Sequence, residues 1–416
     1  MAGWTRIAVM ILLTLGLGIG GVRAQSMIRA VALAGDPAPG GGTFEHFGVE
    51  ALPIVAPVNT KGQVAFFATL LRSTASEAFF LAGKSRTIRV VAEGDRVPGG
   101  GTFSGFGRHP IPALNERGDV AFAAAVVGGR TVEGIFIRDA RGLRRVVLTG
   151  GAAAGMTSGA IAAVDAPALN DRGDVAFLAS VRRGRETIEA LYTFAGGRVT
   201  KIVAQGDPAP AGGTFAGFGP PVIDNRRRVA FAAVVEGRAV PGGVFVADGA
   251  SVRMLTGAGN ETPIGGIFAR FSERVALNDA GAVAFTAVLK NAEVEQGVFL
   301  VDDQGVRKVA ALGEPAPGGG TFGHFSLWPA LAADGSTAFA AAVDGSAVQV
   351  GVFVASGRGA SRVVALGDDL GPSRRLASFG LYPVVSVSAA GGLTFATALA
   401  AGAGVEGIFV VEPPSH

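Results

Sequence analysis

The sequence of 416 residues contains no cysteine, which excludes disulfide bonds, thiolate metal sites and a cysteine nucleophile. Histidine is scarce too, with 4 residues, and neither an H-E-x-x-H nor a G-x-S-x-G motif occurs. Charged residues make up only 17% of the chain, and the formal net charge of +3 is too small to indicate a nucleic-acid-binding protein. These absences remove the commonest metal-dependent and nucleophilic enzyme classes from consideration.

Apolar residues and glycine, by contrast, are abundant. Residues of the apolar class form 49% of the chain, and 65 residues are glycine. Such a composition excludes intrinsic disorder and is typical of many short strands joined by tight turns. The chain is therefore expected to build a large core from β-structure.

Residues 1–24 have the pattern of a cleavable export signal. Arg6 supplies a positive start, residues 7–21 form an uncharged apolar run, and Ala24 ends a small-x-small cleavage site before Gln25. The apolar run is shorter than the ~20 residues that a membrane anchor needs. We therefore expect cleavage after Ala24 and a periplasmic or secreted mature chain without a membrane span.

A motif N-x-x-G-x-x-A-F recurs along the rest of the chain. Its final phenylalanine stands at seven evenly spaced positions, which are Phe66, Phe122, Phe177, Phe231, Phe285, Phe339 and Phe395. Asparagine at the first position and glycine at the fourth indicate a tight turn, in which the Asn side chain bonds nearby backbone and glycine adopts a positive φ. Each motif therefore predicts a β-hairpin, and the period of about 55 residues predicts repeated supersecondary units.

Two further motifs complete each repeat. A G-[IV]-F strand, as in residues 134–136, precedes a turn and a strand of the pattern R-x-V-x-x-x-G, as in residues 144–150. A glycine-rich G-D-x-x-P-G-G-G-T-F-x-x-F segment, as in residues 94–106, links one repeat to the next. Since this segment recurs with the repeat and opens no helix, we interpret it as a tight turn rather than a phosphate-binding loop.

Seven repeats of four antiparallel strands are typical of a β-propeller. The last repeat ends at residues 407–411 without its R-x-V strand, whereas residues 29–35 begin the mature chain with an unattached copy of that strand. We expect the two ends to complete one blade, because pairing them leaves no open sheet edge. The sequence thus predicts an all-β protein in which residues 25–416 form one seven-bladed β-propeller closed by its N-terminal strand.

The repeats resemble those of the bacterial NxxGxxAF tandem-repeat proteins, which are exported and have no defined biochemical role. The resemblance covers essentially residues 29–411 and rests on the N-x-x-G-x-x-A-F copies described above. The hairpin is also similar, more loosely, to the turn of propellers related to the periplasmic protein TolB, whose role is protein binding. Neither resemblance implies a catalytic residue.

Candidate ligand-binding residues are those at which one repeat departs from the others, since ligand sites prefer a few polar groups on an apolar scaffold. Large or polar side chains precede the Asn position at His109, Asp165, Glu273, Arg274, Trp328 and Tyr382. The segments between paired phenylalanines add His46, Arg270 and His324. For each residue the simpler interpretation is a solvated loop position, and for Trp328 it is core packing. As a group they are expected to line the mouth of the central channel.

No metal or cofactor site is expected. The recurring acids Asp36, Asp95, Asp207, Glu314 and Asp368 supply one carboxylate per linker, whereas Ca²⁺ usually takes six to eight oxygen ligands. Bonding of each carboxylate to its own turn is the better interpretation.

Two classes of function remain open. The first is a non-enzymatic, monomeric binding or scaffold module that recognises a protein or a glycan through its loop-rich face. The second is a hydrolase or lyase that acts on a carbohydrate or lactone at the channel mouth, with His109 and either Asp165 or Glu273 as acid and base. The distance between these side chains discriminates the two, because general acid–base catalysis needs partners within hydrogen-bond reach.

Overall fold

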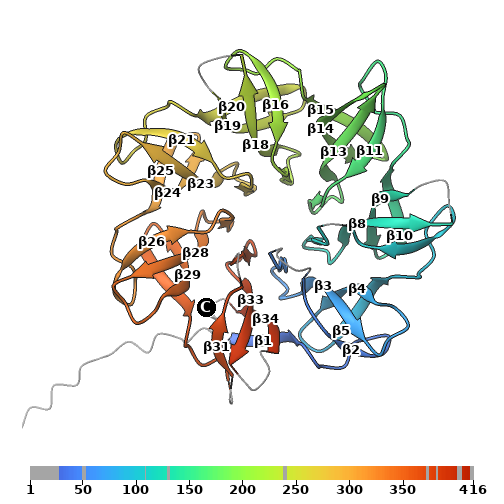
Figure 1. The fold of residues 1–416 in the computed structure, drawn as a ribbon, viewed down its shortest axis with the longest axis horizontal. Helices are drawn as coiled ribbons and strands as arrows, with labels where there is room; N and C mark the ends of the chain where they lie inside the picture. The colour runs from blue at the N-terminus through green and yellow to red at the C-terminus, as the bar shows by residue number, and fades with distance from the viewer. Residues whose placement is uncertain are drawn as a thin grey trace, which may run out of the picture.

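The computed structural model describes residues 28–48, 53–107, 109–128, 132–237, 241–371, 374–380, 383–400 and 405–412. Within them the strands form seven separate antiparallel sheets, and no helix is long and apolar enough to cross a membrane. Figure 1 shows the sheets arranged as blades around a common axis. The predicted seven-bladed β-propeller is confirmed, whereas the predicted export signal lies outside the described residues.

The blades follow one another along the chain. Blade 1 contains β2 (Thr43–Phe44), β3 (Val64–Leu71), β4 (Glu77–Ala82) and β5 (Thr87–Ala92). Blade 2 contains β6 (Thr102–Gly105), β7 (Ala113–Leu114), β8 (Val120–Val127), β9 (Glu133–Asp139) and β10 (Gly142–Leu148). Blade 3 contains β11 (Ala160–Val164), β12 (Ala168–Leu169), β13 (Val175–Arg183), β14 (Glu186–Ala195) and β15 (Arg198–Ala204). Blade 4 contains β16 (Thr214–Phe218), β17 (Val222–Ile223), β18 (Val229–Glu236), β19 (Gly242–Asp248) and β20 (Ser251–Gly257).

The remaining three blades complete the ring. Blade 5 contains β21 (Ile267–Phe271), β22 (Ala276–Leu277), β23 (Val283–Lys290), β24 (Gln296–Asp302) and β25 (Gly305–Ala311). Blade 6 contains β26 (Thr321–Phe325), β27 (Ala330–Leu331), β28 (Thr337–Asp344), β29 (Val350–Ser356) and β30 (Gly359–Ala365). Blade 7 contains β31 (Arg375–Ser378), β32 (Val385–Val387), β33 (Leu393–Ala400) and β34 (Val405–Val411), together with β1 (Ile28–Leu33).

The innermost strand of a blade is broken into two pieces. In blade 2, β6 and β7 both pair with β8, and the same division occurs in blades 3 to 7. The T-F-x-x-F motif, which the sequence indicated as a linker, therefore starts the innermost strand instead. We call the interruptions in blades 2 to 6 the inner-strand breaks; their described residues are 106–107, 109–112, 165–167, 219–221, 272–275 and 326–329.

Proline explains most of the breaks. Pro112, Pro167, Pro221 and Pro329 each stand directly before the second piece of the innermost strand. Proline has no backbone N–H to donate to the neighbouring strand, so the ladder is interrupted at that position. The chain between the pieces is then free to carry side chains that the repeat does not prescribe.

The second strand of each blade is buried on both faces because neighbouring blades pack face to face. In β23, for example, the first five residues are all buried. Four phenylalanines, one from each motif position, pack together in blade 6. The ring centroid of Phe322 lies 5.7 Å from that of Phe339 and 5.0 Å from that of Phe353. The ring centroids of Phe325 and Phe339 lie 5.5 Å apart. Such contacts between aromatic edges and faces stabilise the packing beyond the burial of apolar area.

The predicted Asn-Gly turns are confirmed, and they also join neighbouring blades. Asn115 Oδ1 accepts hydrogen bonds from the backbone N–H groups of Arg117 and Asp119, and Gly118 has a φ of 91°. The side-chain amide then donates to the corresponding turn of the next blade. These bonds run from Asn59 to the carbonyl of Asn115 (3.1 Å), from Asn115 to that of Asn170 (3.1 Å), from Asn170 to that of Asp224 (2.9 Å) and from Asn278 to that of Ala332 (3.1 Å).

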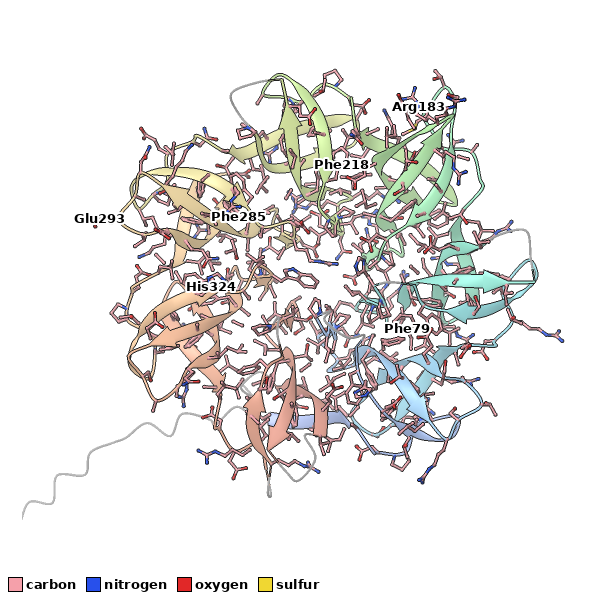
Figure 2. All side chains as sticks on the ribbon, viewed as in Figure 1. Phe79, Arg183, Phe218, Phe285, Glu293 and His324 are labelled. Atoms are coloured by element: carbon pink, nitrogen blue, oxygen red, sulfur yellow. The ribbon has the colours of Figure 1, made fainter. Side chains whose placement is uncertain are left out.

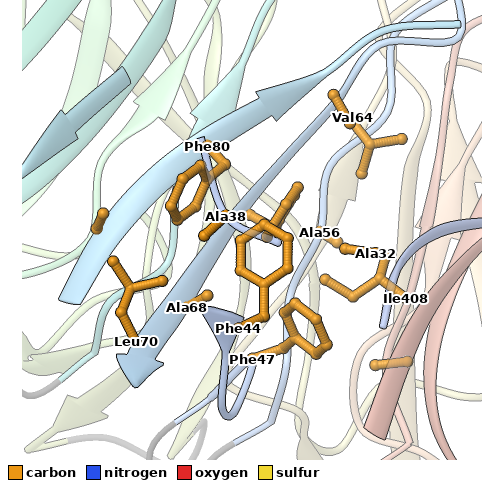
Figure 3. Packing of buried hydrophobic residues seen from close by; sticks show 14 of the residues in the cluster. Ala32, Ala38, Phe44, Phe47, Ala56, Val64, Ala68, Leu70, Phe80 and Ile408 are labelled. Atoms are coloured by element: carbon orange, nitrogen blue, oxygen red, sulfur yellow. The ribbon is translucent and has the colours of Figure 1, made fainter. Parts of the chain in front are cut away.

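Closure of the ring by the N-terminal strand is confirmed. β1 pairs antiparallel with β34 and forms the outermost strand of blade 7. Ala32 of β1 and Ile408 of β34 are buried with Phe44 and Phe47 of the following blade, as Figure 3 shows. The first and last strands thus contribute to one core between blades 7 and 1.

Candidate functional site

The inner-strand breaks surround a cavity of about 810 Å³ at the ring axis. Its lining includes residues 109–111, 219–220 and 272–274 from the breaks of blades 2, 4 and 5, and it continues to residues 241–243 near the loop between the second and third strands of blade 4. Side chains of the blades reach toward the centre of the ring, whereas Arg183 and Glu293 lie at its outer rim (Figure 2).

The structure brings six of the nine predicted residues together in this cavity. These six are His109, Asp165, Arg270, Glu273, Arg274 and Trp328. His46 is not among the lining residues; its Nδ1 lies 3.4 Å from Glu406 Oε1 at the seam between blades 7 and 1. His324 is exposed on β26 and also lies outside the lining, and Tyr382 lies outside the described residues.

His109 and Asp165 form a hydrogen-bonded pair between blades 2 and 3. The distance between His109 Nδ1 and Asp165 Oδ1 is 3.0 Å, and the side chains are 45% and 27% exposed. Asp165 Oδ1 also accepts the backbone N–H of Ala166 at 2.7 Å, which fixes the carboxylate. The imidazole is therefore oriented by a fixed carboxylate while it faces the cavity, as in sites that transfer protons.

Arg274 and Trp328 form a second pair, between blades 5 and 6. The Arg274 guanidinium carbon lies 4.0 Å from the centroid of the Trp328 ring, which is a cation–π contact. Burial lowers the pKa of Arg274 to about 10, and the nearby carboxylates of Asp165 and Glu273 oppose this shift. The side chain remains charged at neutral pH. One face of the Trp328 indole, which the sequence indicated as a candidate ligand-binding side chain, is thus covered by Arg274.

Four glutamates and one glutamine join consecutive blades, and they were not predicted from the sequence. In five blades, glutamate or glutamine stands in the third strand directly before the G-[IV]-F motif or its equivalent and accepts a backbone N–H from the next blade. The bonds are Glu77 to Phe106 (2.9 Å), Glu133 to Val164 (3.2 Å), Glu189 to Phe218 (3.0 Å), Gln296 to Phe325 (3.0 Å) and Glu406 to Phe47 (3.1 Å). The recurrence of Glu or Gln directly before the G-[IV]-F strand was the signal that could have identified them.

Replacing Glu133 with glutamine should stabilise the protein near pH 7. Burial raises the pKa of Glu133, more than the Val164 N–H bond lowers it, and the charge of Asp165 raises it further. A raised pKa in the folded state means that ionisation costs stability as the pH rises above the ordinary value of 4.5. Gln296 shows that an amide accepts the same kind of bond without a charge.

The measurement is the free energy of unfolding of Glu133→Gln and the parent at pH 4 and pH 7. The advantage of the variant should be present at pH 7 and shrink at pH 4, where the parent carboxyl is protonated. Glu133→Ala, which removes the acceptor, should be destabilised at both values. An advantage of Glu133→Gln that does not change with pH would contradict the assigned cause.

The linker acids bind their own turns, as predicted. Asp95 Oδ2 accepts the backbone N–H of Ala92 at 2.9 Å, and its other oxygen pairs with Arg89 of the preceding strand at 3.2 Å. Lys201 and Asp207 repeat this ion pair in the next linker of the same type. Within the described residues no group of three or more His, Asp or Glu side chains is placed to hold a metal ion.

Solved structures with a similar fold include several enzymes. An oligogalacturonate lyase in complex with manganese is 12% identical over 94% of this chain and 99% of its own, with a TM-score of 0.50. A puromycin-hydrolyzing peptidase of Mycobacterium tuberculosis is 12% identical over 87% of this chain and 53% of its own, so this chain spans about half of it, with a TM-score of 0.48. Polysaccharide lyase Uly1 is 9% identical over 94% of this chain and 98% of its own, with a TM-score of 0.47. At such identities the likeness concerns the fold alone.

Sequence comparison gives a more specific result. None of the curated proteins matches the sequence. A family model, described as a family of unknown function, matches residues 58–410, which include most of the ring from the second strand of blade 1 to the last strand of blade 7. The chain therefore belongs to the DUF7453 family, a family of unknown function.

Proposed function

We propose that the protein is an exported, non-enzymatic binding propeller that holds a glycan in its axial cavity. The observation that carries this proposal is that six residues at which the repeats differ line one cavity of about 810 Å³. Residues that the repeats share, by contrast, are engaged in turns and contacts between blades. A concave site of this size with a few polar groups suits a small ligand better than the flat surface of a protein partner.

A second candidate is a glycan-cleaving lyase or hydrolase, and the His109–Asp165 pair favours it. The two side chains meet the geometric requirement for acid–base catalysis, since Nδ1 and Oδ1 lie 3.0 Å apart. Glu273 lines the same cavity and supplies a further carboxylate. Both candidates require glycan binding, so one experiment can test binding first and cleavage of the bound glycan second.

The experiment is a glycan array probed with the protein produced in an exporting host. The intact mass of that material, expected to begin at Gln25, tests export. We expect a restricted set of glycans to bind and to be recovered with unchanged mass. Recovery of cleaved products, lost on His109→Ala, would favour the enzyme instead. A blank glycan array together with binding to a peptide array would overturn the glycan proposal.

Two matched variants place the binding site. Val234 lines the cavity and is 54% exposed, so Val234→Trp should narrow the cavity at little cost to folding and weaken glycan binding. Val132, at 68% exposure, is also a surface valine but does not line this cavity. Val132→Trp should leave binding unchanged, and equal effects of the two variants would argue against the axial cavity.

A further inference from the structure

Two arginines line the axial cavity on the side of blade 5. Within the described residues, neither a hydrogen bond nor an ion pair reaches the guanidinium groups of Arg270 and Arg274. Some arginines of the ring are paired within the protein, as Arg228 is, whose Nε lies 2.6 Å from Asp224 Oδ2, whereas others, such as Arg183, are exposed at the outer surface. Arg274 is half-buried and Arg270 is exposed. An arginine offers five N–H donors, so the half-buried Arg274 is available to a ligand, and Arg270 lies on the same wall of the cavity.

The contact with Trp328 sets the direction of the Arg274 donors. Since the guanidinium carbon lies 4.0 Å from the ring centroid, the indole occupies one face of the cation. The N–H groups lie in the guanidinium plane, so they remain open at its edge. Arg274 and Trp328 come from neighbouring inner-strand breaks, and both line the cavity. The fork of donors is thus held in place before a ligand arrives, which lowers the entropic cost of binding.

Unlike these arginines, two of the acidic side chains that line the cavity are hydrogen-bonded within the protein. Asp165 is bonded to His109, and Glu189 accepts the backbone N–H of Phe218 at 3.0 Å. Glu273 lines the cavity and is exposed, and its charge acts on Arg274 without a hydrogen bond among the described residues. The side of the cavity formed by blade 5 therefore presents two guanidinium groups with one carboxylate beside them, and no described side chain accepts a hydrogen bond from either guanidinium.

Given the proposed function, on which this step rests, we propose that Arg274 and Arg270 form an anionic subsite, with Trp328 as the positioning residue. The ligand class is a glycan with a carboxylate or sulfate group, because two oxygens of either group match the planar fork of a guanidinium. The geometry of the pair carries this assignment, and the partial burial of Arg274, which lowers its pKa, agrees with it, since an anion offsets the partial desolvation of the guanidinium. The subsite selects the charge of the sugar, and the rest of the cavity selects its shape.

Trp328 provides the readout for a test. The chain contains 2 tryptophans, and Trp4 lies in the segment that we expect to be removed on export, so Trp328 is the single tryptophan of a protein that begins at Gln25 and is excited selectively. The probes are oligomers of galacturonic acid, the same oligomers with every carboxyl group methyl-esterified, and a sulfated galactan oligomer. We expect a saturable change in fluorescence with one or both acidic probes and binding of the ester at least about tenfold weaker, since charge-assisted hydrogen bonds are lost. The two acidic probes show whether carboxylate or sulfate is preferred.

Two variants are expected to change the affinity for the acidic probe in opposite directions, which makes the test decisive. Arg274→Gln should weaken binding of the acidic probe about tenfold or more and leave the ester unchanged. Glu273→Gln removes a nearby negative charge and should tighten binding of the acidic probe. Arg183→Gln at the outer rim, where the side chain is exposed, serves as the control and should change neither.

The possible outcomes distinguish failure of the anionic subsite from failure of the proposed glycan-binding function. Equal binding of acid and ester, unchanged by Arg274→Gln, would overturn the anionic subsite while glycan binding stands. Failure of every probe in solution together with a blank glycan array would overturn the proposed function and the subsite with it. Affinity for the acidic probe that is unaltered in the Val234→Trp variant, measured by calorimetry because the new indole adds its own fluorescence, would place the bound glycan outside the axial cavity and also contradict the subsite.

Discussion

Removal of residues 28–34 should reduce stability far more than a deletion in a hairpin loop. The deletion takes away β1, so that β34 becomes an apolar outer edge. It also removes the backbone bond from Ala34 N to Glu406 O and the buried side chain of Leu33, which is 8% exposed. Several ladder bonds at ~0.5–1.5 kcal/mol each, with the lost burial, amount to a substantial part of the ~5–15 kcal/mol that stabilises a typical domain.

The measurement is thermal unfolding with light scattering, beside a control that lacks residues 345–347 in the loop after β28. The truncated chain should unfold at a markedly lower temperature and should aggregate, because an unpaired apolar edge recruits other strands. The control should stay close to the parent. Similar unfolding temperatures for the two deletions, with both proteins monomeric, would show that β1 does not hold the ring closed.

Gly219→Ala should disturb both the stability of the ring and the shape of the cavity. A Cβ atom at Gly219 would overlap the carbonyl oxygen of Glu273, so the breaks of blades 4 and 5 would have to separate. Overpacking of this kind costs about 1–3 kcal/mol, and here it displaces the backbone beside Arg274. We expect lower stability and weaker ligand binding from a single added methyl group.

A matched control for this substitution is Gly357→Ala. No atom lies within 4 Å of a Cβ atom built at Gly357, and its φ is not in the left-handed region. The control should unfold like the parent in a denaturant titration, whereas Gly219→Ala should unfold at a lower denaturant concentration. If the two variants behave alike, the contact between blades 4 and 5 is looser than the structure indicates.

The fold was predictable because every repeat carries the same local sequence signals for turns and strands. Asparagine and glycine fix the turns, alternation of motifs fixes the strands, and the unattached strand at residues 29–35 has one partner that lacks a neighbour. The division of the innermost strand was not predicted. Pro112 and its equivalents were visible in the sequence, but a proline before a short apolar run is equally compatible with a strand that simply begins there.

The candidate site was predictable only as a set of departures from the repeat. Six of the nine residues line the axial cavity because five of them lie in inner-strand breaks and Arg270 lies on β21 just before the break of blade 5. The contact partners of each residue could not be predicted from the sequence, because they depend on how neighbouring blades pack together. His46 thus bonds Glu406 across the ring seam, and Trp328 lies against Arg274 of another blade. Even spacing in the sequence gives a residue's place within its blade and leaves its neighbour in the adjacent blade undetermined.

The most direct test of the closed ring is a disulfide introduced between its two ends. Ile28 of β1 lies opposite Val411 of β34, and the chain has no cysteine to interfere. Residues directly opposite each other in antiparallel strands are close enough for a disulfide bond, whereas a shift of one residue turns the side chains to opposite faces. The variant Ile28→Cys with Val411→Cys should therefore form an intramolecular disulfide on mild oxidation, detected by intact mass and by mobility without reductant. Arg29→Cys with Val411→Cys should not. Crosslinking of both variants, or of neither, would contradict a ring closed by β1 in this register.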